Sequence, residues 1–297
     1  MKKILVPTDF SSNANKALDF AVQFAKQAKA EIVLVHACDL VGTTFKDHLS
    51  IKKEHNKEVL DKANEHLALL KKSIEDTEKV TVNVKIYNGN VTDNILQASE
   101  ENNADFIVIG TRGNTELTER IFGSTTSGLL GKTVVPLIVV SPLSEWDVTS
   151  KPLPETDPEG GKFAPAAILL ATSHFEENKA LLDPIVDVAK LFSSTIHVVV
   201  FVDTDIAEAY DYVYNLGELS HYIGFLKKTY PGVSFKGELL EGDDFESTIE
   251  KYNDKNGVDI MAMITYPKNF LDRMLKKKMT KEMALHSKIP VMAITAK

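Results

Sequence analysis

The residues best suited to chemistry in this chain of 297 residues form one glycine-rich segment. Gly110 and Gly113 lack a β-carbon, so they can turn the backbone tightly and let it approach a ligand. Gly123, Ser124 and Thr125 follow, and they offer backbone N–H groups and two hydroxyls at the expected start of a helix. Such groups, together with the positive end of a helix dipole, favour phosphate. The segment therefore predicts a phosphate site, the alternative being that its glycines only form turns.

Apolar runs and helical patterns alternate on both sides of this segment. Strands are expected at 2–7, 31–37, 80–87, 105–110 and 136–140, and helices at 12–29, 46–76, 92–102 and 122–132. Ser11 or Ser12 can cap the first helix through its hydroxyl. The alternation predicts an α/β fold with a parallel sheet and helices on both faces. Ligands bind such sheets at the carboxyl ends of the strands, where the glycine-rich segment lies.

The second half of the chain repeats the first. Residues 4–9 match 168–173, residues 15–18 match 178–181, residues 105–109 match 259–263, and residues 136–140 match 290–294. The matches keep their order and nearly their offset, which indicates duplication. The stretch 144–165 is rich in proline and has no apolar period, as in an extended linker. The expected organisation is a domain at 1–144, a linker at 145–163 and a domain at 164–297.

The glycine spacing resembles a family motif. Gly110-x2-Gly113-x9-Gly123-Ser124, with Pro7-Thr8-Asp9 ending the first strand, is similar to the motif of nucleotide-binding universal stress proteins. The closing run 136–140 also resembles the last strand of that family. Because the resemblance covers both halves, it implies two tandem Rossmann-like domains. Each would hold a five-stranded parallel sheet in the order 3-2-1-4-5.

The resemblance also implies roles for residues at the matching positions. Pro7, Thr8 and Asp9 would lie against adenine and ribose, Ala37 would line the base pocket, Ile109 and Gly110 would flank the ribose and phosphates, and Gly113, Gly123, Ser124 and Thr125 would hold the phosphates. Asp9 has an alternative role as a turn or helix-capping carboxylate. The implied ligand is ATP or another adenine nucleotide, with the participation of Mg²⁺ left open.

The second half departs from this motif. Gly110, Gly113, Gly123 and Ser124 are replaced by Ile264, Pro267, Lys277 and Lys278, while Asp9 becomes Ser173 and Ala37 becomes Phe201. Proline removes an N–H group, and isoleucine places a branched side chain where the backbone should approach phosphate. Phe201 could fill the space of the base. We therefore expect nucleotide binding by the first domain only.

Composition excludes several classes of protein. The net charge is −8 and no long basic stripe is present, which argues against nucleic acid as a partner. No apolar run approaches the roughly 20 residues of a membrane span. The N-terminus does not read as a signal peptide, and Cys38 has no second cysteine to pair with, so we expect a cytoplasmic protein. Without paired cysteines or a His/carboxylate cluster, we expect no structural metal.

Three functions remain open from the sequence. The first is a regulatory protein of the stress response, in which bound nucleotide changes the surface offered to an unidentified protein partner. The second is a slow ATPase, but the sequence shows no general base for hydrolysis and we assign no catalytic residue. The third is a structural or interaction module. Single-domain family members pair through the last strand, so 136–140 and 290–294 could form an intramolecular pseudo-dimer, with a homodimer of the whole chain left open.

Overall fold

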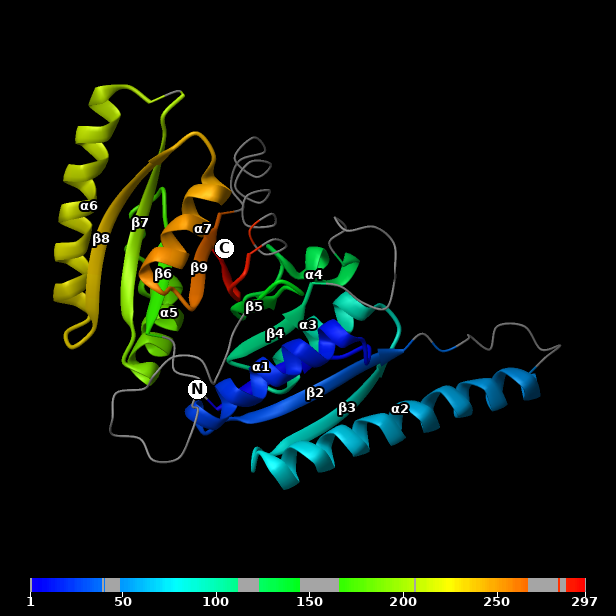
Figure 1. The fold of residues 1–297 in the computed structure, drawn as a ribbon. Helices are drawn as coiled ribbons and strands as arrows, with labels where there is room; N and C mark the ends of the chain where they lie inside the picture. The colour runs from blue at the N-terminus through cyan, green and yellow to red at the C-terminus, as the bar shows by residue number, and fades with distance from the viewer. Residues whose placement is uncertain are drawn as a thin grey trace. The chain divides into compact units, whose positions relative to one another are not determined.

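The computed structural model describes residues 2–38, 40, 49–111, 123–144, 166–205, 207–266, 283 and 287–296. The chain divides into two compact units, residues 1–129 and residues 130–297. Both units are built from parallel strands with intervening helices (Figure 1). The predicted α/β class is therefore confirmed.

Among its described residues, the first unit contains four parallel strands. Its elements are β1 (Lys3–Pro7), α1 (Ser12–Ala28), β2 (Glu31–Cys38), α2 (Leu49–Thr77), β3 (Val82–Asn88), α3 (Val91–Glu101), β4 (Phe106–Gly110) and α4 (Ser124–Leu129). The strands lie in the order β3-β2-β1-β4, and each paired neighbour is parallel. Strands β1 and β4 are almost wholly buried, as expected for a parallel sheet covered on both faces.

Helix α1 shows how the local sequence builds this unit. Ser11 caps it, because its side chain accepts a hydrogen bond of 3.1 Å from the N–H of Ala14. Phe20 and Phe24 lie four residues apart on one face, and both are fully buried against the sheet. Lys29 ends the helix in a left-handed conformation. The cap at Ser11 confirms one of the two predicted positions.

The second unit contains the remaining strands. Its elements are β5 (Leu137–Val140), β6 (Ala167–Ala171), α5 (Lys179–Phe192), β7 (Thr195–Asp203), α6 (Ala209–Thr229), β8 (Ser234–Gly242), α7 (Phe245–Asn256), β9 (Ile260–Thr265) and β10 (Val291–Thr295). The order is β5-β10-β9-β6-β7-β8, and every pair from β10 to β8 is parallel. The five strands of the second repeat therefore follow the predicted order 3-2-1-4-5.

The last strands of the two repeats pair with each other. Strand β5 runs antiparallel to β10, with Val139 opposite Val291 and Ile138 opposite Met292. Beyond β5, the hydroxyl of Ser141 donates to the backbone oxygen of Ser287 over 2.7 Å. This is the pairing expected of the closing strands, and it is made within one chain. Because β5 pairs with β10, it belongs to the second compact unit. The domain boundaries predicted from the sequence repeat, 1–144, 145–163 and 164–297, stay a prediction.

The expected helix at 122–132 differs most from the structure. The described helix, α4, has only six residues and ends at Leu129. Gly131 follows with a φ of 79°, a left-handed conformation that glycine adopts without strain. The helical pattern therefore stops before Lys132, and the prediction was too long at its end. The remaining elements of the first half lie where they were expected, with small differences at their ends.

Candidate functional site

A cavity of about 300 Å³ lies at the carboxyl ends of β1, β2 and β4 in the first unit. The lining residues come from these three strands and from α1, α3 and the start of α4. They are Pro7, Thr8, Asp9, Ala14, Val35, Ala37, Val91, Ile95, Ile109, Gly110, Thr111, Gly123, Ser124, Thr125 and Thr126. This is the edge of the sheet at which parallel α/β folds bind ligands.

The lining includes every site residue predicted from the sequence except Gly113, which lies outside the described residues. Sequence reasoning missed Val91 and Ile95, although they lie one helical turn apart on α3 and so share a face. It also missed Val35, which lies on the same face of β2 as Ala37 because strand side chains alternate. Residue spacing within each element shows which of these residues share a face, but not that the face lines a pocket.

The end of β1 is held by short hydrogen bonds. The N–H of Thr8 donates to the backbone oxygen of Val35 over 2.8 Å, so the strand end is fixed against β2. One carboxylate oxygen of Asp9 accepts from the N–H of Ser11 over 3.0 Å. Asp9 therefore has the turn role named as its alternative, and it also lines the cavity. The two roles are compatible, since a carboxylate has two acceptor oxygens.

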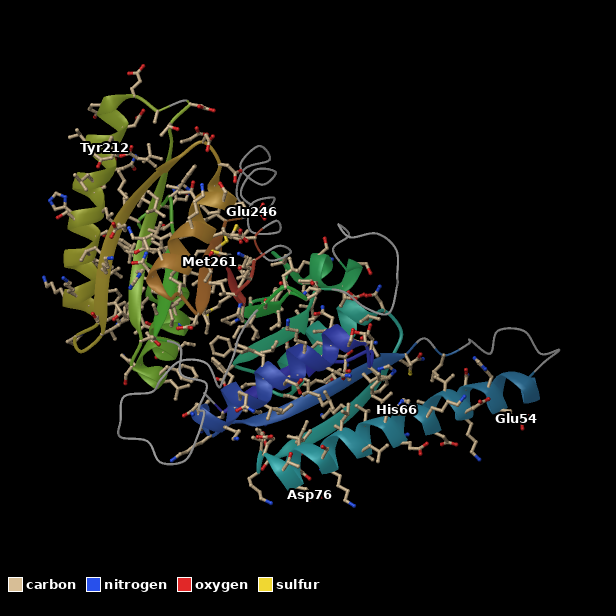
Figure 2. All side chains as sticks on the ribbon, viewed as in Figure 1. Glu54, His66, Asp76, Tyr212, Glu246 and Met261 are labelled. Carbon is tan, nitrogen blue, oxygen red and sulfur yellow. The ribbon has the colours of Figure 1, made fainter. Side chains whose placement is uncertain are left out.

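Phe10, which lies between Asp9 and the cap of α1, has an unusual backbone conformation. Its φ is 63°, a left-handed conformation that is uncommon for a bulky residue. Its ring lies 4.6 Å from the ring of His36 and 5.0 Å from that of His66, which Figure 2 labels on α2. The Nδ1 atom of His36 lies 2.8 Å from the backbone oxygen of Thr8. These contacts hold the chain in the conformation that turns Asp9 towards the cavity, and nothing in the local sequence predicted them.

Gly110 is required by packing as well as by the site. A β-carbon there would lie 2.7 Å from the side-chain nitrogen of Asn13 and 2.8 Å from its backbone oxygen. The first turn of α1 therefore rests directly on the end of β4. The backbone oxygen of Gly110 also accepts from the hydroxyl of Thr126 over 2.8 Å, which ties α4 to the same point. The sequence interpretation, that this glycine serves close approach of a ligand, missed its role in helix packing.

The start of α4 differs from the expected phosphate site in one respect. The N–H of Gly123 donates to the backbone oxygen of Thr111 over 2.8 Å, so this group is not available to a ligand. The first N–H groups of any helix have no acceptor within the helix, which leaves those of Ser124 and Thr125 at the cavity. Since α4 has six residues, its dipole is small, and anion binding here depends on N–H groups and hydroxyls.

The matching positions of the second unit carry aromatic side chains. Phe201 replaces Ala37 at the end of the second strand, and Phe245 replaces Val91 as the first residue of the third helix of its repeat. Their rings contact edge to face with centroids 5.4 Å apart. Phe201 was predicted to fill the space of the base. Phe245 was not predicted, because the replacement at Val91 becomes visible only when the two helix starts are aligned.

The first helix of the second repeat also begins later. Asn15 matches Asn178, which caps α5, so the residues before Asn178 precede this helix although their counterparts lie in α1. Glu176, the counterpart of Asn13, accepts a hydrogen bond of 2.6 Å from the hydroxyl of Tyr266. The backbone oxygen of Glu176 accepts from the hydroxyl of Tyr222 over 2.7 Å.

The chemistry of this second-unit cluster is fixed by burial. Burial, followed by the hydrogen bond to Glu176, raises the pKa of Tyr266 above its ordinary value. Burial and then the charge of Glu176 raise the pKa of Tyr222 in the same direction. Both phenols therefore stay protonated at neutral pH and act as donors. The replacements Lys277 and Lys278 lie outside the described residues.

Within the described ranges, no group of three or more His, Cys, Asp or Glu side chains could hold a metal ion. Among the helices that the structure describes, none is both long and apolar enough to cross a membrane.

Comparisons with known proteins give the family of the chain. The family described as the universal stress protein family matches residues 1–141. A universal stress protein of Bacillus subtilis is 31% identical over 153 residues, an alignment that covers 46% of this chain and 97% of that protein. One from Methanocaldococcus jannaschii is 28% identical over 153 residues, covering 47% of this chain and 94% of that protein. The crystal structure of a universal stress protein from Archaeoglobus fulgidus covers 99% of this chain and 98% of its own, with 21% identity and a TM-score of 0.70. The chain belongs to the universal stress protein family.

Proposed function

We propose that the first unit binds an adenine nucleotide, ATP or a relative of it, and that the protein acts in regulation of a stress response. The observation that supports this most is the cavity at the carboxyl ends of β1, β2 and β4. Its lining includes the residues at which the family motif places the nucleotide, apart from the undescribed Gly113. A cytoplasmic location is part of the proposal, and it agrees with a sequence whose one cysteine, Cys38, is buried.

The cavity has an apolar part and a polar part. Val35, Ala37, Val91, Ile95 and Ile109 give an apolar wall from β2, α3 and β4 that suits the faces of a purine. The polar part holds Thr111, Ser124, Thr125 and Thr126. In the proposed complex the base lies against the apolar wall and the phosphates lie at the start of α4. Asp9, at the end of β1, offers an acceptor for the exocyclic amine of adenine.

Binding is proposed for the first unit only. In the second unit, Phe201 and Phe245 contact each other at the positions where Ala37 and Val91 line the cavity. A base could enter there only if both rings moved. The absence of the motif glycines points the same way.

We propose binding rather than catalysis as the main activity. Hydrolysis of ATP needs a positioned water, neutralised phosphate charge and usually Mg²⁺. Asp9 is the acid in the described lining, and one of its oxygens is already bonded to the N–H of Ser11. That arrangement does not provide a general base aimed at a terminal phosphate. A role as an interaction module without nucleotide is the remaining candidate, and a measurement of retained nucleotide distinguishes it from the proposed function.

The test combines nucleotide retention with a graft from the second unit. Purified full-length protein is denatured, and its supernatant is analysed for adenine nucleotides. Thermal shifts are then measured with ATP, ADP and AMP, with Mg²⁺ or with a chelator. We expect retained nucleotide or a clear shift in the wild type. Ala37→Phe, which copies Phe201, should weaken binding by about 10- to 100-fold, the effect of overfilling a pocket by ~1–3 kcal/mol.

Leu69→Phe is the matched control, because Leu69 is exposed on α2 and away from the cavity. It adds an aromatic ring without narrowing the pocket and should bind nucleotide like the wild type. Absence of both retained nucleotide and any thermal shift would overturn the proposal and leave the interaction module. Steady Mg²⁺-dependent release of phosphate would replace the regulatory role with an ATPase. Unchanged binding by Ala37→Phe would place the nucleotide elsewhere.

A further inference from the structure

Exposed apolar side chains gather on one helix of the second unit. Tyr210, Val213 and Tyr214 of α6 are 72%, 68% and 53% exposed, and Leu216 and Tyr212 are also exposed. Figure 2 labels Tyr212 on this part of α6. The other exposed large apolar residues of the described chain are scattered singly. A cluster of this kind marks an interaction surface more often than an isolated residue does.

The outer face of α6 is the side of the helix opposite the residues that pack on the unit. Leu219, Tyr222 and Leu226 are buried and define the face that packs on the unit. With 3.6 residues per turn, the opposite face carries two adjacent rows with a spacing of seven. One row is Tyr210, Gly217 and Gly224, and the other is Tyr214, His221 and Lys228.

The two glycines leave gaps in this face. A β-carbon at Gly217 or Gly224 would meet no other atom within 4 Å among the described residues, so packing within that part of the chain does not require either glycine. Glycine in an exposed helix interior is less stable than alanine. Beside the gaps, the rings of Tyr210 and Tyr214 stack with centroids 6.1 Å apart. The face therefore combines protruding rings near the start of the helix with open positions further along it.

The charges of α6 divide between its two ends. Glu208 and Asp211 lie at its start and Glu218 near its middle, whereas Lys227 and Lys228 lie in its last turn. Two such helices placed antiparallel would bring each acidic end beside a basic end. A parallel arrangement would instead bring like charges together. The helix is thus complementary to an antiparallel copy of itself.

We propose that the outer face of α6 is the interface of a homodimer, in which α6 of a second copy packs antiparallel on it. With the twofold axis beside Leu219, Tyr214 of one copy lies over Gly224 of the other, and Gly217 faces His221. Tyr210 then lies beside Lys228, an arrangement that suits a cation–π contact. Each contact occurs twice, as in any isologous interface, so the assembly closes at two copies.

The acidic start of α6 argues against a membrane surface as the occupant, since interfacial helices carry mainly Lys and Arg on their polar side. Helix α6 has 21 residues and so is about 30 Å long. Contact along one helix buries less than the ~1,600 Å² of a standard interface. The dimer is therefore reversible and depends on concentration. This inference is independent of nucleotide binding and stands if that proposal fails.

Sedimentation velocity of the full chain tests the dimer, over concentrations from about 5 to about 300 µM, where a small interface dissociates. The wild type should shift from monomer to dimer. Gly224→Leu fills the gap that receives Tyr214 and should raise the dissociation constant at least ~10-fold. Leucine is a better helix former than glycine, so the thermal midpoint of the monomer should not fall. Loss of the dimer with an unchanged or higher midpoint therefore separates a lost interface from misfolding.

Leu69→Ala is the matched control, because Leu69 is 60% exposed on α2 of the first unit. It changes an exposed apolar position outside α6 and should leave the dissociation constant of the dimer unchanged. A wild type that stays monomeric throughout the range overturns the proposal. A dimer that persists in Gly224→Leu also overturns it, because another surface must then pair. Binding of the wild type to anionic lipid vesicles, lost in Tyr214→Ala without any self-association, would replace the second copy with a membrane.

Zero-length carbodiimide cross-linking tests the orientation. Lys228 and Asp211 of one helix are separated by roughly 25 Å along its axis, so a direct link cannot form within a helix. In the antiparallel dimer, Lys227 or Lys228 should link to Glu208 or Asp211, and peptide mapping should find that pair. The link should disappear in Gly224→Leu. Parallel packing would bring carboxylates beside carboxylates and lysines beside lysines, so no link could form between the two helices. A dimer without the Lys–acid link would therefore contradict the proposed interface.

Discussion

The carboxyl ends of β1, β2 and β4 enclose a cavity, whereas the matching ends of β6, β7 and β9 carry aromatic side chains in mutual contact. Ala37 and Val91 line the cavity in the first unit, and Phe201 and Phe245 replace them in the second. Strand order is the same in both repeats as far as each unit shows it. The fold therefore accepts either small or large side chains at this edge of the sheet. The reason is that the strands are stabilised by packing at their buried centres, away from this edge.

A second difference concerns the first helix of each repeat. In the first unit, α1 begins early and its Asn13 rests on Gly110. In the second, isoleucine stands at the position of Gly110, and Glu176 lies before α5 with Tyr266 as its donor. The glycine and the early helix start therefore belong together. Losing one without the other would produce a clash or a gap.

The largest expected effect is on stability at Gly110. Gly110→Val would force a side chain to within 2.7 Å of Asn13, in a part of the chain where backbone cannot easily move. We expect a loss of about 3 kcal/mol or more in the free energy of unfolding, measured by urea titration. The control is Gly217→Ala, where a β-carbon meets nothing within 4 Å of the described residues; it should gain up to ~1 kcal/mol. Equal effects at both sites would show that Gly110 is not packed as described.

The next largest effect is expected when Phe201 and Phe245 are both replaced by the smaller residues of the first unit. Phe201→Ala with Phe245→Val copies the first unit and removes the contact between two half-buried rings, so we expect a loss of about 1–2 kcal/mol in unfolding free energy. We also expect no nucleotide binding in the second unit. Thermal shift with ATP, in a background carrying Ala37→Phe, measures this. A gain of binding would show that side-chain volume alone separates the two units, and that the helix start and motif glycines do not matter.

A smaller effect is expected from pH in the second unit. Tyr266 has a folded-state pKa raised by burial and then by the bond to Glu176. Its stabilising contribution is complete below the unfolded pKa of about 10 and is lost as the pH rises above it, because the unfolded chain then ionises first. The free energy of unfolding should fall between pH 9 and about 11 and fall less in Tyr266→Phe. Identical pH profiles of the two proteins would contradict the assigned environment of Tyr266.

The smallest effect on stability is expected at Asp9. Asp9→Asn keeps an oxygen that can accept from the N–H of Ser11, so unfolding free energy should change by less than about 0.5 kcal/mol. If Asp9 also contacts the base, nucleotide affinity should fall by roughly 10-fold, as for loss of one charged hydrogen bond. Isothermal titration separates the two roles. Unchanged affinity would leave Asp9 with its turn role alone.

The site was largely predictable because its parts are local patterns. Gly110 ends an apolar strand, and Ser124 begins a helix. Gly113 was predicted on the same spacing and stays a prediction, since it lies outside the described residues. The missed residues Val91, Ile95 and Val35 lie on elements whose inward face the sequence shows only once the pocket is placed. Thr126 was missed because its role is a hydrogen bond to the backbone of Gly110.

The sequence by itself determined the alternation of strands and helices, a serine cap for the first helix at Ser11 or Ser12, and the two unequal copies of the motif. These properties depend on neighbours within a few residues, through side-chain period, capping and backbone freedom. Only the tertiary structure decided that Asn13 packs against Gly110 and that the N–H of Gly123 donates to a backbone oxygen. It also decided that the ring of Phe201 contacts that of Phe245. Those outcomes depend on which distant residues share a buried volume, and close packing in three dimensions fixes them.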